Sequence, residues 1–130
     1  MAIYGIGAFY DEDVSEEFID AGVVGTGWDA QCAPELHHYF RTLKVGDIVY
    51  LKAANFGRPI TVKGIGLISD TDILSKADYY LTEVGRRVKW ISTEHFTLPK
   101  PAEKNNVRSN TVYEEFHPAV QQEILKRFKP

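Results

Sequence analysis

Apolar and polar positions alternate along several short stretches of the chain and follow a helical period in others. Stretches rich in β-branched and aromatic residues predict strands at residues 3–9, 23–28, 48–53, 60–69, 86–91 and 111–116. The stretch 48–53 is the clearest, and we expect 60–69 to pair antiparallel with it across the loop at 55–59. In 86–91, Val88 and Trp90 alternate with Arg87 and Lys89, as a half-exposed strand requires.

Three other stretches predict helices by their capping residues and apolar spacing. Asp13 and Glu16 resemble a capping box that opens a short helix, and Gly22 is suited to end it in the left-handed conformation. Pro34 begins a second helix of about three turns, and Pro118 begins the last one. The apolar faces of the second and third helices are made by Leu36, Tyr39, Phe40 and Leu43, and by Val120, Ile124 and Phe128.

The order of these elements predicts the fold class. A strand, a helix, a strand and a helix are followed by a run of strands and a last helix. This order indicates an α+β domain with a twisted, mainly antiparallel sheet or partly closed barrel. Residues 44–47 are expected to form a turn, 70–81 a loop or short helix, and 99–110 a loop or mobile segment. No domain boundary interrupts the 130 residues, so we expect a single domain.

Composition fits a globular domain, and charge adds an asymmetry. Apolar residues make up 44% of the chain and charged residues 25%, which argues against disordered and fibrous classes. The net charge of −3 hides a division, because residues 1–40 hold eight acids and no Lys or Arg, whereas residues 41–100 hold ten bases and six acids. We therefore expect a basic face and an acidic back, not a protein that wraps a polyanion.

The N-terminal residues and the cysteine content do not indicate export. No basic segment precedes an apolar stretch, and no apolar run reaches the roughly eighteen residues of a membrane helix. The single cysteine, Cys32, cannot form an internal disulfide, which suits a reducing compartment. We expect a cytoplasmic protein that does not bind membranes. A metal site at Cys32, His37 and His38 is disfavoured, because neighbouring helical side chains point about 100° apart.

Three of the predicted strands contain Gly-x-Gly, at residues 5–7, 25–27 and 64–66. Phosphate binding by these pairs is disfavoured, since the third glycine is missing and none lies between a strand and a helix of a βαβ unit. Glycine within a strand allows sharp bending and the close approach of another segment or a ligand. The pairs therefore indicate a curved sheet, and some of them are candidates to line a cleft.

Segments 24–29, 43–50 and 62–68 together resemble a PUA-like domain, and they are most similar to the EVE-type modules of modification-dependent restriction systems. In that superfamily a Lys-x-Gly-Asp turn, here residues 44–47, leads into a barrel strand, and the next strand often carries a Gly-x-Gly segment. The resemblance covers roughly residues 3–91. It implies a pseudo-barrel with helices at its openings and a concave pocket. In many relatives that pocket holds a flipped or single-stranded base, often a modified one.

A base pocket needs an aromatic face for stacking and polar groups for the base edge. Trp28, between a glycine pair and Asp29, is the first candidate for stacking, and Asp29 is a candidate acceptor for an exocyclic amine. Tyr4, Tyr50 and Trp90 are further candidates. The alternatives are a packing role for either tryptophan and a turn-forming role for Asp29.

Basic residues gather on the predicted strands and turns of the barrel region: Lys44, Lys52, Arg58, Lys63, Arg86, Arg87 and Lys89. Candidates for phosphate contacts are Lys52, Arg58, Lys63, Arg87 and Lys89, each adding salt dependence to binding. The hairpin across 55–59 is expected to bring Lys52 and Lys63 near one another. The alternative is a solvated strand face, because acids are interspersed among these bases.

The sequence therefore favours a non-catalytic module, without a cofactor, that binds a nucleic-acid base or a related nucleoside-like ligand. Two other functions stay open. The resemblance also extends to amidohydrolases of the ASCH type that act on modified nucleosides, for which Lys63 and Glu83 are the candidate cleft residues. The other is a protein-interaction module or homodimer with Trp28, Trp90 and the C-terminal helix as its apolar surface.

Overall fold

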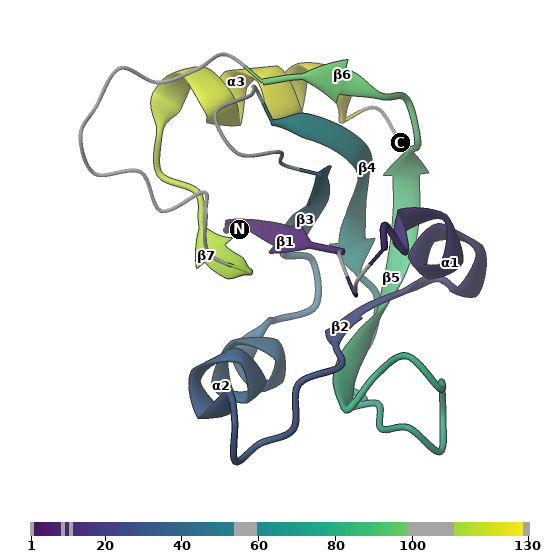
Figure 1. Ribbon diagram of the computed structural model, residues 1–130. Coiled ribbons are helices and arrows are strands. Elements are labelled where there is room, and N and C mark those ends of the chain that lie inside the picture. The colour runs from purple at the N-terminus through teal and green to yellow at the C-terminus, as the bar shows by residue number, and fades with distance from the viewer. Residues whose placement is uncertain (1, 9, 11, 54–59, 99–110, 129–130) are drawn as a thin grey trace.

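The computed structural model describes residues 2–8, 10, 12–53, 60–98 and 111–128. Within them the fold is α+β, with three helices and a seven-stranded, mostly antiparallel sheet that curls into a half-barrel (Figure 1). The strands are β1 (Ile3–Gly7), β2 (Val23–Thr26), β3 (Ile48–Ala53), β4 (Thr61–Ile68), β5 (Val84–Ser92), β6 (Phe96–Thr97) and β7 (Val112–Glu114). The helices are α1 (Ser15–Ala21), α2 (Pro34–Thr42) and α3 (Pro118–Arg127).

The sheet runs in the order β2-β5-β4-β3-β1-β7, and β6 adds to β4. The predicted antiparallel pairing of β3 with β4 is confirmed, with Ile48 opposite Leu67. β1 and β3 run parallel, with Ile3 opposite Ile48, and this is the one parallel pairing among the described strands. The parallel pair joins two segments that are separated in the chain by α1, β2 and α2, so no local pattern predicted it.

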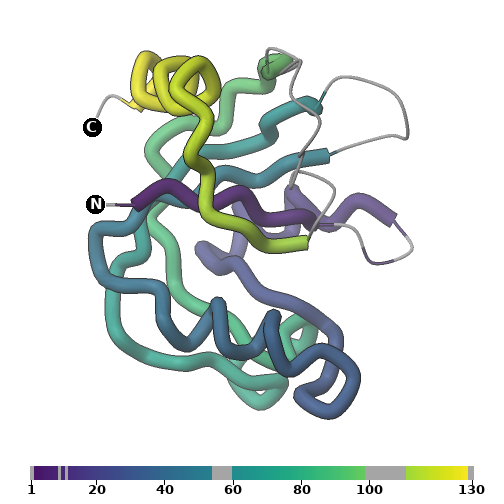
Figure 2. The backbone as a smooth tube through the Cα atoms, turned by 90° about the vertical axis from the view of Figure 1, so that its left-hand side faces the viewer, coloured from purple at the N-terminus to yellow at the C-terminus, as the bar shows by residue number. Residues whose placement is uncertain are grey.

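The two faces of the sheet bury separate hydrophobic clusters. One cluster contains Val49 and Leu51 of β3 together with residues of α1 and α2, and the other contains Ile48 and Tyr50 together with residues of α3. Because β3 is buried on both faces, residues 48–51 form an uninterrupted apolar run in the sequence. α3 and α2 lie at opposite ends of the molecule in both backbone views (Figures 1 and 2).

The helices begin and end close to the predicted positions. α2 and α3 begin at Pro34 and Pro118, and Gly22 ends α1 with a left-handed φ of 68°. At the start of α1, Asp13 Oδ1 accepts the backbone N–H of Ser15 at 2.9 Å. The predicted capping box is not formed, because the N-cap of α1 is Val14, which has no side-chain cap, and the Glu16 carboxylate makes no hydrogen bond within the described residues.

Three further connections were predicted as loops or as a short helix. Residues 70–81 form turns and contain no helix, which settles the alternative that the sequence left open. The predicted loops at 55–59 and 99–110 lie outside the described residues. No helix in the described part of the chain has the length and hydrophobicity to cross a membrane.

The glycine pair on β4 accommodates a tryptophan from the neighbouring strand. A Cβ at Gly66 would lie 3.0 Å from the indole of Trp90 and 2.5 Å from the side chain of Val88. The register of β4 against β5 shifts between Ile65 and Gly66, and such bulges bend a strand. This glycine pair therefore serves sheet curvature and close packing.

Candidate ligand-binding site

Trp28 lies in the turn between β2 and α2 and exposes 61% of its surface. Hydrogen bonds fix the backbone on both sides of it. Its N–H donates to Oγ1 of Thr26 at 3.2 Å, and its carbonyl oxygen accepts from Nε2 of His37 at 2.7 Å. The large indole is therefore presented to solvent from an ordered turn.

Asp29 continues the same turn. Its carboxylate accepts the backbone N–H of Cys32 at 2.8 Å, and hydrogen bonding to Cys32 is the main reason why the pKa of Asp29 lies below its ordinary value. The side chain is exposed beside Trp28. Asp29 thus forms the turn and also presents an ionised carboxylate at neutral pH.

Tyr10, which the sequence analysis did not single out, lies beside this turn. Its ring packs against Gly27, where a Cβ would be 3.1 Å away, and stands edge-on to Phe18 with 5.9 Å between ring centroids. Its hydroxyl is buried and has no hydrogen-bond partner within the described part of the chain. Burial, with a smaller effect of Tyr79, raises the pKa of the Tyr10 hydroxyl, so it stays protonated and can donate. No local pattern marks Tyr10, because its importance depends on how the β1–α1 connection packs on the end of β2.

Tyr50 belongs to the core, apart from the Trp28 turn. It is fully buried in the cluster under α3, and its hydroxyl is 2.6 Å from that of Tyr113 and donates to Glu115 at 2.8 Å. Its hydroxyl and ring are thus used within the protein, and we do not include Tyr50 in the candidate site.

Trp90 and Tyr4 also pack against the core. Trp90 is partly buried, covers the glycine pair of β4 and donates its indole N–H to the carbonyl of Phe18 at 3.2 Å. Tyr4 is half-buried on β1 and stands edge-on to Tyr39 at 6.4 Å between ring centroids. Trp90 therefore has the packing role that was the alternative to stacking, and Tyr4 packs in a similar way. Trp28 is the candidate that presents an open aromatic face.

The two lysines of the β3–β4 hairpin do not come together. Lys52 is buried, with its Nζ 4.8 Å from the ring centroid of Tyr113 in the cluster under α3. Lys63 lies on the α1 side of the sheet, with its Nζ 3.8 Å from the Asp13 carboxylate. They occupy opposite faces because a strand alternates its side chains and Lys52 is paired with Val62, the neighbour of Lys63.

The bases on β5 are also largely engaged within the protein. Arg87 forms ion pairs with Asp70 at 3.3 Å and Asp72 at 2.7 Å, and hydrogen bonds to Asp72 and then Asp70 raise the pKa of Arg87. Arg86 is 2% exposed and donates to backbone carbonyls, so it belongs to the core and not to a basic face. Lys89 is exposed on the same side of the strand as Arg87, as predicted. Arg58 lies outside the described residues.

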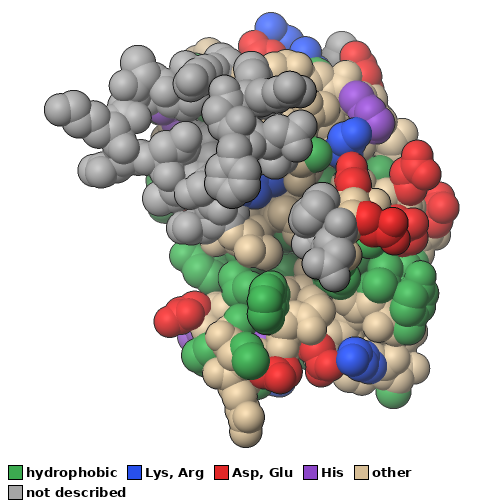
Figure 3. Space-filling model, in the orientation of Figure 1, with side chains coloured by type: hydrophobic (Ala, Val, Ile, Leu, Met, Phe, Trp, Pro, Cys, Tyr) green, Lys and Arg blue, Asp and Glu red, His purple; other side chains and the backbone are tan. Residues whose placement is uncertain are grey.

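The acidic residues of the N-terminal region form the charged surface that the composition predicted. Glu12, Asp13, Glu16 and Asp20 are exposed. Acidic side chains gather over α1 in the space-filling view (Figure 3). Phosphate groups are repelled from this side of the molecule.

The residues of the two alternative functions are dispersed. Lys63 is next to Asp13, whereas the Glu83 carboxylate pairs with Lys76 at 2.9 Å and does not line the pocket that contains Lys63. Trp28 precedes α2, at the end of the molecule opposite α3. A single interface made of Trp28, Trp90 and α3 would have to span the molecule.

Cys32 is an exposed free thiol. His37 is buried, with its Nε2 used by the Trp28 carbonyl. Among the residues that the structure describes, no group of three or more His, Cys, Asp or Glu side chains is placed to hold a metal ion.

No family model matches the chain, and no curated protein matches it. The curled half-barrel with few helices is compatible with a PUA-like pseudo-barrel.

Proposed function

We propose that the chain is a non-catalytic module that binds an unpaired nucleic-acid base, or a nucleoside-like ligand, by stacking it on Trp28. The observation that carries this proposal is the exposed indole on a turn that is hydrogen-bonded on both sides. Because the backbone on both sides of Trp28 is hydrogen-bonded, a stacking ligand has to order only the two side-chain torsions of the indole. Base stacking on such a ring is worth about 1–3 kcal/mol and tolerates every base.

A polar group beside the indole supports recognition of a base edge. The Asp29 carboxylate is exposed next to Trp28 in the chain, and it is an acceptor for an exocyclic amine. Tyr10 supports the turn by packing its ring on Gly27, while its buried hydroxyl is closed to a ligand. A polar group next to a stacking face is what a base pocket requires.

The distribution of charge favours a short ligand. Lys52, Lys63 and Arg87 are engaged with side chains of the protein, and acids cover α1. Tight binding of a duplex would need many phosphate contacts. We therefore favour a nucleotide or the end of a single strand. The half-barrel is compatible with a PUA-like pseudo-barrel, and the resemblance of the sequence to EVE-type modules supports the same class of ligand.

The experiment follows the two indole N–H signals of the isotope-labelled protein by NMR. Nucleoside monophosphates and a four-nucleotide single strand are titrated in turn. The signal of Trp28, assigned with Trp28→Phe, is expected to shift, while the signal of Trp90 serves as an internal control because it is bonded to Phe18. Trp28→Ala should weaken binding about tenfold or more.

Tyr80→Ala is the matched control, since it removes another exposed aromatic ring, 67% accessible. A folded Trp28→Ala variant that binds as tightly as the wild type would overturn the proposal. Release of a carboxylic acid from an N-acylated nucleoside would replace it with the amidohydrolase function. A melting temperature that rises with protein concentration, without ligand binding, would favour the dimer.

A further inference from the structure

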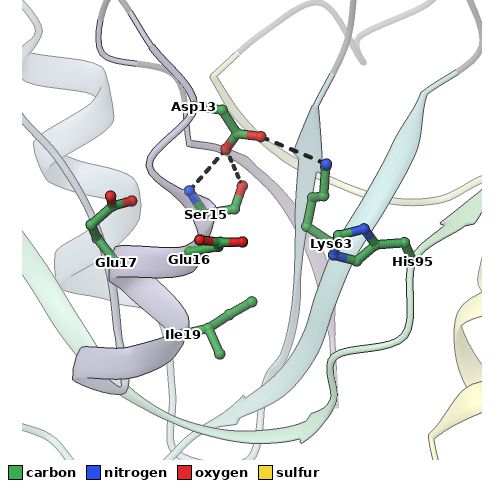
Figure 4. Close-up of a pocket in the computed structure, with 7 residues that line it drawn as sticks. All are labelled: Asp13, Ser15, Glu16, Glu17, Ile19, Lys63 and His95. Atoms are coloured by element: carbon green, nitrogen blue, oxygen red, sulfur yellow. Dashed lines mark hydrogen bonds and ion pairs between the residues drawn. The ribbon is translucent and has the colours of Figure 1, made fainter.

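A pocket of about 220 Å³ lies between α1, strand β4 and the β5–β6 connection, and no residue of the Trp28 turn lines it (Figure 4). It is lined by Asp13, Ser15, Glu16, Glu17, Ile19, Lys63 and His95. Its volume is below the roughly 300–1,000 Å³ of pockets that hold drug-sized molecules. The pocket therefore suits a ligand smaller than a drug-sized molecule.

The walls of this pocket carry opposite charges. Figure 4 shows the Glu16 carboxylate directed into it from α1, and Lys63 and His95 on the facing side. The side chain of Ile19 lies between the two walls and supplies an apolar floor, whereas the Glu17 carboxylate points away. A ligand can thus place a charged or hydrogen-bonding group against each wall and an apolar group against Ile19.

The charged groups are incompletely satisfied by each other. Asp13 uses one carboxylate oxygen for Ser15, while its other oxygen is 3.8 Å from Lys63 Nζ, at the outer limit of an ion pair. The Lys63 ammonium therefore keeps N–H groups for a further acceptor. The Glu16 carboxylate has no hydrogen bond or ion pair within the described residues, so it keeps its full capacity as an acceptor.

We propose that this pocket binds a small zwitterion of the amino-acid type, with the ligand's ammonium group on Glu16 and its carboxylate on Lys63. An aliphatic side chain of the ligand would cover Ile19. A simple carboxylate has no ammonium group to offset its repulsion by Glu16, and a simple amine leaves Lys63 without a second acceptor. The proposal is independent of base binding at Trp28, because the two sites share no residue.

The test compares three ligands of nearly equal shape: L-valine, isobutylamine, which lacks the carboxylate, and 3-methylbutanoate, which lacks the ammonium group. Each is titrated to about 10 mM into the labelled full chain, a concentration that fills most of a millimolar site. We expect L-valine to shift the backbone signals of residues 13–19, 63 and 95. Each analogue should bind at least tenfold more weakly than L-valine.

Two variants assign the roles of the walls. Glu16→Gln and Lys63→Met should each weaken L-valine binding about tenfold, while Glu35→Gln and Lys126→Met, exposed charges outside the pocket, should leave it unchanged. Equal binding of isobutylamine and L-valine would overturn the proposal in favour of a simple cation site. The absence of shifts with all three ligands in the folded protein would overturn it outright.

Discussion

The guanidinium group of Arg86, on β5, donates to the carbonyl oxygen of Phe40 in α2 at 2.9 Å. It also donates to the carbonyls of Leu43 and Asp70, so one buried side chain joins the end of α2 and the β4–β5 connection to the sheet. The last carbonyls of a helix have no partner within the helix, and Arg86 supplies donors for them. Burial lowers the pKa of Arg86, although Asp70 and Asp47 oppose this effect.

Replacement of Arg86 by methionine is expected to lower the free energy of unfolding by about 2–4 kcal/mol. Three buried or half-buried carbonyl groups lose their donor, and the apolar side chain cannot replace it. Urea denaturation measures the change. Arg87→Met is the control, because Arg87 is exposed and its ion pairs contribute at most about 1 kcal/mol. Equal losses in the two variants would contradict the role assigned to Arg86.

The buried Tyr50 hydroxyl predicts a loss of stability at alkaline pH. Burial, followed by the effects of Tyr113 and Glu115, raises the pKa of Tyr50 above its ordinary value of 10.0. As the pH rises, the unfolded chain therefore loses the Tyr50 proton before the folded chain does. The stability that the protonated Tyr50 hydroxyl gives to the folded state is complete below pH 10 and declines above it, by about 1.4 kcal/mol per pH unit.

The comparison of wild type with Tyr50→Phe isolates this effect. At neutral pH the variant should be less stable by about 1–3 kcal/mol, since Glu115 loses a buried donor. The difference should shrink as the pH rises above 10, because only the wild type has the Tyr50 proton to lose. Tyr80→Phe removes the hydroxyl of an exposed tyrosine and serves as the control. A constant difference for Tyr50→Phe would show that its hydroxyl titrates normally in the folded protein.

Local patterns predicted much of the fold. The strand at 48–53 is identified with its observed bounds because it is buried on both faces and apolar at every position except Lys52. Gly22, Pro34 and Pro118 mark helix ends because their backbone preferences act within a few residues. The parallel pairing of β1 with β3 has no such local signal, because α1, β2 and α2 separate the two strands in the chain.

The candidate site was predictable only in part, for the same reason. Trp28 and Asp29 are adjacent in sequence, so their proximity is guaranteed, whereas Tyr10 reaches the turn by packing on Gly27. The burial of Arg86 was predictable from the strand pattern, although the sequence analysis counted it only among the basic residues. It is two positions before Val88, and the period of a strand places it on the buried face.

The two tryptophans are expected to respond oppositely to truncation. Trp28→Ala should change the free energy of unfolding by less than about 0.5 kcal/mol, because the exposed indole makes few buried contacts. Trp90→Ala should cost about 3–5 kcal/mol, because it removes the ring that covers Gly64 and Gly66 and one of the two donors to the Phe18 carbonyl. Thermal or urea unfolding distinguishes the two. A strongly destabilised Trp28→Ala would show that the indole packs against the fold in solution, contrary to a free stacking face.

The salt dependence of oligonucleotide binding should be shallow. Each phosphate contact of a single strand adds about −0.7 to the slope of log affinity against log salt concentration. Of the described candidates for phosphate contact, Lys52 lies under the Tyr113 ring, Lys63 is beside Asp13 and Arg87 is paired with acids, whereas Lys89 is exposed. We therefore expect a slope of about −0.7 for a four-nucleotide strand at the Trp28 site.

Variants of exposed lysines test that assignment. If Lys89 makes the contact, Lys89→Met should bring the slope close to zero while the shift of the Trp28 indole signal persists. Lys126→Met, at an exposed lysine on α3, should leave the slope unchanged because α3 lies at the opposite end of the molecule from α2. A wild-type slope steeper than about −2 would require at least three phosphate contacts, and the ion pairs of Lys63 and Arg87 would then have to open on binding.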